Sequence, residues 1–122
     1  MLEASFHGDI QATVFRVKGV LVQGELLKFI KQIDPTDRTL LNIYDFREAI
    51  WDAGSLTQFR ENTIEASQYQ RKGMRTAFVF SRDEDYGLGR VVENLAELFG
   101  FKATIAALRD INEAREWLTR TE

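Results

Sequence analysis

The sequence predicts a single α/β domain in which a five-stranded mixed sheet packs with four helices. Two apolar runs, Leu40–Tyr44 and Ala77–Phe80, are too short for apolar helices and are typical of strands buried on both faces. The segment Tyr86–Phe99 places leucines and valines at positions 88, 91, 92, 95 and 98, which form one apolar face of a helix. Strand and helix patterns then alternate. This alternation predicts three parallel strands with helical crossovers, added to an antiparallel hairpin.

The hairpin is predicted at the start of the chain. Its strands are Glu3–His7 and Ile10–Val17, and Gly8-Asp9 between them suits the positive φ angles of a tight two-residue turn. The single histidine, His7, lies beside this turn and is interpreted as a surface residue. The next segment, Glu25–Ile33, has apolar residues at helical spacing, and Pro35 just beyond it prevents the helix from continuing.

The second half of the chain carries clear start and stop signals. Ser55 and Gln58 have the spacing of a capping box, which opens a helix to about Tyr69. A strand is predicted over Arg75–Ser81. The helix Tyr86–Phe99 follows this strand and is expected to end at Gly100. The remaining elements are a strand over Phe101–Leu108, a capping box from Asp110 to Glu113, and a last helix whose Trp117 and Leu118 should seal the sheet.

Composition limits the classes of function. With 122 residues the chain is expected to form one domain, residues 1–122, and the absence of cysteine excludes disulfides and thiolate metal ligands. A single histidine argues against a zinc site, so no metal or cofactor is expected. The net charge of -3 and the scattered basic residues argue against nucleic-acid binding. Without a signal peptide or a long apolar segment, the protein is expected to be cytoplasmic.

The stretch that follows the central strand, Asp45–Gly54, is the place where a site is expected. The strand Thr39–Phe46 should lie in the middle of the sheet, and ligands of open α/β sheets gather outside the carboxyl ends of the strands. The alternative is a solvated connector. Trp51 favours a site, because Ala49-Ile50-Trp51 is more apolar than a connector needs.

The closing pattern of the chain, YGLGRVVENLAELFGFKATIAALRDINEAREWL, together with the element order and the Asp45–Gly54 stretch, resembles the SpoIIAA-like family of bacterial proteins. These proteins are STAS-type domains, related in fold to anti-sigma-factor antagonists. The resemblance spans nearly the whole chain and implies the STAS fold. It also implies a regulatory or protein-interaction role and favours a homodimer.

In the antagonists, the corresponding strand leads to a serine at a helix start that a partner kinase phosphorylates. The similar stretch here is Trp51-Asp52-Ala53-Gly54-Ser55, in which Ala53 occupies the expected acceptor position. Alanine has no hydroxyl to phosphorylate, and Ser55 already has a capping role. We therefore expect no phosphorylation switch.

SpoIIAA-like proteins have also been compared with CRAL-TRIO lipid-binding domains, which implies an apolar pocket between helices and sheet. The side chains here that would suit such a pocket are those of Phe46, Ile50, Trp51, Phe59 and Ile64. For Phe46 and Phe59 the stronger interpretation is packing in the core. Trp51 is expected at the mouth of a pocket or partner groove, and Ile64 falls off its helix stripe, which would leave apolar surface for a dimer.

Two functions remain open. The first is a non-enzymatic regulatory or protein-interaction module. The alternative is a carrier or sensor of a small apolar ligand or lipid, which would allow peripheral membrane contact. An enzyme is not expected, because the carboxylates in this stretch have no nucleophile or histidine beside them. The candidate ligand or partner site consists of Asp45, Phe46, Ile50, Trp51, Asp52, Ser55, Phe59 and Ile64.

Overall fold

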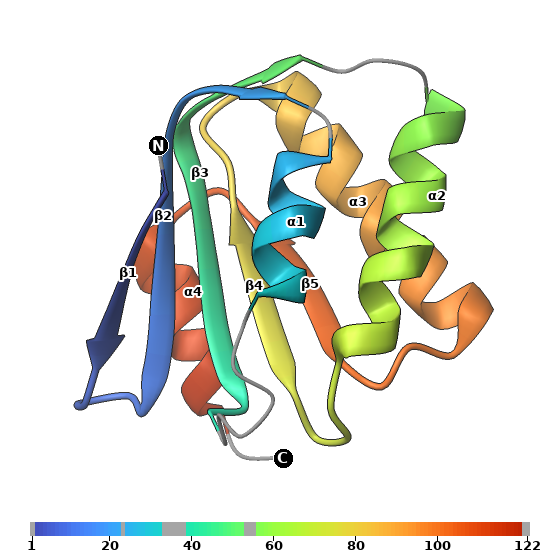
Figure 1. Ribbon diagram of the computed structural model, residues 1–122. Coiled ribbons are helices and arrows are strands. Elements are labelled where there is room, and N and C mark those ends of the chain that lie inside the picture. The colour runs from blue at the N-terminus through green and yellow to red at the C-terminus, as the bar shows by residue number, and fades with distance from the viewer. Residues whose placement is uncertain (1, 23, 33–38, 53–55, 121–122) are drawn as a thin grey trace.

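The computed structural model describes residues 2–22, 24–32, 39–52 and 56–120, and within these ranges the side chains of residues 21, 22, 26, 29, 51, 52 and 56–59 are not described. The chain forms, in order, β1 (Leu2–His7), β2 (Ala12–Val22), α1 (Glu25–Lys31), β3 (Leu41–Asp52), α2 (Leu56–Ala66), the 3-10 helix η1 (Ser67–Tyr69), β4 (Arg75–Val79), α3 (Asp83–Phe99), β5 (Thr104–Leu108) and α4 (Ile111–Thr119) (Figure 1).

The five strands form one sheet in the order β1-β2-β3-β4-β5. β1 is antiparallel to β2, and β2 to β5 are parallel to one another. Parallel crossovers are right-handed, and each crossover here joins neighbouring strands, so α1, α2 and α3 all fall on one face of the sheet. The opposite face is left for α4 (Figure 1). The predicted α/β class and mixed five-stranded sheet are therefore confirmed.

Each face of the sheet has its own apolar core. On the side of α1, α2 and α3 the core consists of Phe15, Val17, Tyr44, Phe46, Ala49, Phe80 and Ala107, with Leu2, Phe78 and Tyr86 packed against it. On the side of α4 it consists of Ala12, Val14, Ile43, Ala77, Val79, Ala114 and Leu118, with Trp117 among the residues at its margin. Trp117 and Leu118 therefore seal the sheet as the sequence predicts.

Two predicted helix boundaries are also confirmed. Gly100 ends α3 in the left-handed conformation, with φ of 62°, and its amide donates to the carbonyl of Ala96. Asp110 caps α4, because its Oδ1 accepts the amides of Asn112 at 2.6 Å and Glu113 at 3.3 Å.

The predicted two-residue turn of the hairpin is wrong. The loop between β1 and β2 has four residues, from Gly8 to Gln11, and the positive φ of 54° belongs to Gln11. The loop is held by the Ile10 amide, which donates to the His7 carbonyl at 3.3 Å, and by the Gln11 side chain, which donates to the Gly8 carbonyl at 2.7 Å. These bonds form a turn over His7–Ile10, the usual basis of four-residue hairpin loops.

The central strand is longer than predicted, and the expected Asp45–Gly54 loop is wrong as far as Asp52. β3 runs to Asp52 because β2 also continues, pairing Val20 with Ile50 and Val22 with Asp52. Residues 53 and 54 lie outside the described residues. The candidate residues Asp45, Phe46 and Ile50 therefore sit on a strand.

α3 begins three residues earlier than predicted. Its first turn holds Asp83, Glu84 and Asp85, and acidic side chains at this end interact favourably with the helix dipole. Arg82, which precedes the helix, donates to the Asp85 carboxylate through Nε at 3.1 Å and Nη2 at 3.2 Å. This pair fixes the entry of the chain into α3.

Candidate functional site

The site lies where β2 and β3 extend beyond the rest of the sheet. β3 pairs with β4 only as far as Asp45, opposite Val79, but it pairs with β2 up to Asp52. The residues Lys18–Val22 and Glu48–Asp52 therefore form a two-stranded ribbon past the carboxyl ends of β4 and β5, and we call it the β2–β3 ribbon. This end of parallel strands is where sites of α/β sheets usually form.

A β-bulge marks the start of the ribbon. Arg16 pairs with Asp45 and Lys18 pairs with Glu48, so Val17 faces both Phe46 and Arg47. A bulge bends its strand and re-aims the side chains on it. Here Phe46 enters the core at 2% exposure, while Arg47 stays exposed.

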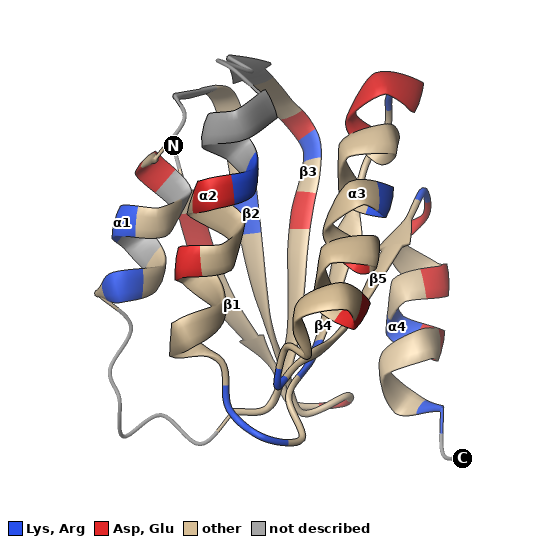
Figure 2. Cartoon of the chain, turned by 90° about the vertical axis from the view of Figure 1, so that its right-hand side faces the viewer, with Lys and Arg blue, Asp and Glu red and all other residues tan. Residues whose placement is uncertain are grey.

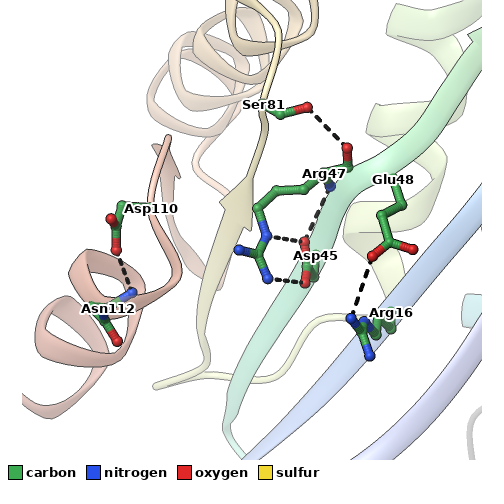
Figure 3. A network of polar contacts seen from close by, with 7 residues as sticks. All are labelled: Arg16, Asp45, Arg47, Glu48, Ser81, Asp110 and Asn112. Carbon is green, nitrogen blue, oxygen red and sulfur yellow. Dashed lines mark hydrogen bonds and ion pairs between the residues drawn. The ribbon is translucent and has the colours of Figure 1, made fainter.

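Asp45 is a buried carboxylate held by a single arginine two residues away. Its Oδ1 accepts the Arg47 amide at 3.1 Å and Nε at 2.9 Å, and its Oδ2 accepts Nη2 at 2.9 Å (Figure 3). Burial alone would raise the pKa of Asp45. The hydrogen bonds and charge of Arg47, together with the charge of Arg16, outweigh burial and hold this pKa below its ordinary value. Asp45 is therefore an ionised, committed partner of Arg47.

The ends of β4 and β5 are tied to this strand through Ser81 and Arg109. The Ser81 hydroxyl donates to the Arg47 carbonyl at 2.9 Å (Figure 3). Arg109 donates to the Ser81 carbonyl at 2.8 Å and to Asp83 at 2.6 Å, and its guanidinium lies 5.5 Å from the centre of the Tyr86 ring. These contacts join β3, β4, β5 and α3 into one rigid edge.

All four arginines of this edge have carboxylate partners, and they are Arg16, Arg47, Arg82 and Arg109. Besides the pairs above, Arg16 lies 3.4 Å from Glu48, and both side chains are about half exposed. Figure 2 shows acidic, basic and acidic positions in succession along β3, with the acidic first turn of α3 at the same end of the molecule. A phosphate or carboxylate ligand would have to displace an existing carboxylate, so the edge is not built as an anion site.

The chemistry of a catalytic centre does not come together at this edge in the described part of the chain. The Ser81 hydroxyl donates to a backbone carbonyl, and His7 contacts Ser5 and Arg115 at the opposite edge strand. Among the described residues, no group of three or more His, Asp or Glu side chains could hold a metal ion. Within the same residues, no helix is long and apolar enough to cross a membrane.

The ribbon carries an exposed apolar pair. Val20 and Ile50 face each other across the two strands, and they are 59% and 53% exposed. Alternation along β3 places Ile50 on the same side of the ribbon as Glu48, whose partner is Arg16. The result is an apolar centre with a charged margin, which is how protein interfaces are commonly built.

Of the candidate residues chosen from the sequence, the four with described side chains lie in different surroundings. Asp45 is tied to Arg47, and Phe46 lies in the core with its ring centre 5.4 Å from that of Phe80 and 6.1 Å from that of Tyr44. Ile50 is exposed on the ribbon and Ile64 is half-buried on α2. The side chains of Trp51, Asp52, Ser55 and Phe59 lie outside the described residues.

Sequence reasoning missed the contribution of β2. Val20, Arg16 and the bulge opposite Val17 were not singled out, because the second hairpin strand was expected to end at Val17. The sequence Val20-Leu21-Val22 held a usable signal, since β-branched residues favour strands.

No protein-family model and no curated protein sequence matches this chain. Among solved structures, it is similar to an uncharacterised protein of the DUF3478 family with a SpoIIAA-like fold from Shewanella loihica PV-4. The match has a TM-score of 0.56 and covers 97% of this chain and 92% of the other, at 13% sequence identity. This chain has a SpoIIAA-like fold. The resemblance found in the sequence is thus confirmed, and at this identity the likeness concerns the fold alone.

Proposed function

We propose that this protein is a non-enzymatic protein-interaction module of STAS type that binds a protein partner through the β2–β3 ribbon. The observation that supports the proposal is the exposed Val20–Ile50 pair. Two aliphatic side chains paired across a projecting ribbon give a partner an apolar contact, and burying their exposed parts would contribute roughly 1–2 kcal/mol each.

The surroundings of the pair suit a protein partner better than a small anion. Arg16 and Glu48 form a half-exposed ion pair beside it, and such pairs give an interface specificity and register more than affinity. The Asp45–Arg47 pair and Ser81 hold the base of the ribbon in a fixed position. The fixed base limits the positions that the ribbon can take relative to the sheet, which reduces the entropy lost on binding.

The proposed module works without the phosphorylation switch of the antagonists. Ala53 has no hydroxyl at the expected acceptor position. A phosphate is held best by a free basic group, and each arginine of this edge already pairs with a carboxylate. Partner binding would then be controlled by the presence of the partner and not by a kinase.

The test is affinity capture from cell lysate with quantitative mass spectrometry, comparing the wild type with Ile50→Asp. The matched control is Leu98→Asp on α3, because Leu98 is also exposed, at 74%, but lies away from the ribbon. We expect a defined partner to be enriched by the wild type and by Leu98→Asp, and lost with Ile50→Asp. Melting curves should show that both variants fold.

Two results would argue against the proposal. Equal capture by the wild type and Ile50→Asp would remove the ribbon from the interaction. A lipid or other small apolar molecule found bound in native mass spectrometry of the purified protein would favour the carrier function instead.

A further inference from the structure

β1 is an open edge of the sheet. It lies at one margin in Figure 1, and within the described residues only β2 pairs with it. Its ladder with β2 runs without a register shift from Leu2, opposite Val17, to His7, opposite Ala12. Proteins usually protect such edges with proline, charged side chains or a bulge, and Leu2–His7 has only the single charge of Glu3.

The two sides of β1 differ in chemistry. Glu3, Ser5 and His7 are opposite Arg16, Val14 and Ala12, which places them on the face that α4 covers further along the sheet. Ala4 and Phe6 point to the other face, and both are exposed, Phe6 at 58%. The strand therefore has one polar and one largely apolar face, and its middle residues, from Glu3 to Phe6, are exposed on both.

We propose that β1 pairs antiparallel with β1 of a second copy of this chain, about a two-fold axis that passes through Ser5. In this register Glu3 is opposite His7 of the second copy, and Ala4 is opposite Phe6. On one face Glu3 meets His7 and the Arg115 guanidinium, which lies 3.2 Å from the His7 ring and also pairs with Asp9. On the other face the exposed apolar side chains meet. The sheet then continues through both molecules.

The axis is fixed by the side-chain pattern. A two-fold axis perpendicular to the sheet keeps the faces aligned, so residues opposite each other must share a face. An axis through Phe6 would place Glu3 opposite Asp9, which is repulsive. An axis through Ala4 would place Leu2 opposite Phe6 but put Glu3 opposite Ser5, so the acid would have no basic partner. Only the axis through Ser5 pairs both the charged and the apolar side chains.

Pairing of β1 with β1 of a second copy also gives an assembly that ends at two molecules. Pairing of β1 with β5 of another molecule would leave a free edge at each end and would add further copies without limit. Pairing of β1 with itself uses one edge of each molecule and stops at two. The surface is separate from the β2–β3 ribbon, so the dimer leaves the proposed partner site free.

Cysteine cross-linking tests both the contact and its register, because the chain has no native cysteine. In Ser5→Cys the two thiols would meet at the axis, where opposed Cα atoms of an antiparallel pair are about 4.5–5.5 Å apart, within disulfide range. The control is Ala4→Cys, whose two copies would be roughly 8 Å apart and unable to bond. We expect a covalent dimer from Ser5→Cys under mild oxidation and a monomer from Ala4→Cys.

A non-covalent measurement completes the test. Phe6→Asp should raise the dimer dissociation constant about 10-fold or more in sedimentation, since two apolar contacts are lost, whereas Leu98→Asp should leave it unchanged. A wild type that stays monomeric with no cross-link in Ser5→Cys would overturn the proposal. A cross-link in Ala4→Cys, or a dimer that ignores Phe6→Asp, would show that another register or another surface is used.

Discussion

Gly89 is the residue at which α3 comes closest to the sheet. A Cβ atom at this position would lie 2.4 Å from Cε2 of Phe80 and 2.9 Å from the Cβ of Ala107. Because neither neighbour can move without disturbing the aromatic core, Gly89→Ala should lower the free energy of unfolding by about 1–3 kcal/mol. Urea denaturation measures it directly.

The same helix supplies a matched control. Gly87 is exposed, and a Cβ at this position would have nothing within 4 Å. Gly87→Ala should raise stability by about 0.5–1 kcal/mol through helix propensity. Equal effects from the two substitutions would show that close packing is not what requires glycine at position 89.

Asp45 should make stability depend on acid. Its folded-state pKa is lowered by Arg47, so its contribution is complete above the unfolded value of about 3.9 and is lost as the pH falls through the folded value. Asp45→Asn should therefore be about 1 kcal/mol less stable than the wild type at pH 7, with the difference vanishing in strong acid. Urea unfolding between pH 7 and pH 2 is the measurement.

The control for this pH series is Glu116→Gln, which removes an exposed acid on α4. Its stability should follow that of the wild type at every pH. If Asp45→Asn also ran parallel to the wild type, the ion pair with Arg47 would make no net contribution to stability, and the carboxylate would serve only to fix the bulge.

The sequence singled out Asp45 and Phe46 for a sound reason: they follow a buried apolar run. The sequence could not show that the Asp45 carboxylate would be buried against Arg47, because that geometry depends on the bulge opposite Val17. Nor could periodicity tell a pocket-lining Phe46 from a core one. The aromatic neighbours that bury it are Tyr44 on β3, Phe78 on β4, and Phe80, which directly follows β4.

Among the elements, α4 depends on Arg75 of β4. The guanidinium donates to the carbonyl of Trp117 at 2.6 Å and to that of Arg120 at 3.1 Å, and it lies 4.4 Å from the centre of the Trp117 ring. A cation at a helix carboxyl end interacts favourably with the dipole and with its free carbonyls. Arg75 thus holds the last turn of the helix on the sheet.

Arg75→Lys should keep the charge but lose the planar fork that reaches two carbonyls and a ring. We expect a loss of about 1–2 kcal/mol, with faster amide exchange in the last turn of α4. Arg90→Lys is the control, because Arg90 is mostly exposed and pairs with Glu93 one turn away on the same helix. Similar small losses from both variants would mean that charge alone secures the helix.

Element boundaries were predicted well where a local signal sets them and poorly where a partner strand does. Gly100 and Asp110 act within their own turns, and both were found from the sequence. The length of β3 is decided by β2, which continues to Val22 and supplies ladder partners for a stretch whose polar residues interrupt the apolar pattern. The four-residue hairpin loop was missed because Gln11, not a glycine, takes the positive φ.

At the scale of the molecule, the fold class followed from the alternation of strands and helices, since right-handed crossovers between neighbouring strands leave few arrangements. The site did not follow from it. It is formed by a difference in strand length, with β2 and β3 passing the ends of β4 and β5. The local pattern Val20-Leu21-Val22 indicates that β2 continues, but it does not tell that β3 continues beside it while β4 ends.

That difference in length predicts uneven local stability. In the body of the sheet, β3 is paired on both sides, by β2 and by β4, and it is buried at Ile43 and Tyr44. In the ribbon each strand has one neighbour in the sheet, and an isolated two-stranded ribbon is only marginally stable in water. The ribbon should therefore open locally without unfolding of the whole protein.

Native-state hydrogen exchange measured by NMR can detect this opening. Slowly exchanging amides over Lys18–Val20 and Glu48–Ile50 should be protected roughly 100-fold less than those over Asn42–Tyr44, which corresponds to a gap of about 2.7 kcal/mol. Binding of the partner proposed for Val20 and Ile50 should reduce the gap, because the bound surface cannot open. If the amides of the ribbon and of the body of the sheet instead exchanged at the same rate in the free protein, the ribbon would have to be stabilised by contacts beyond its two strands. The interface would then be fully formed before the partner binds.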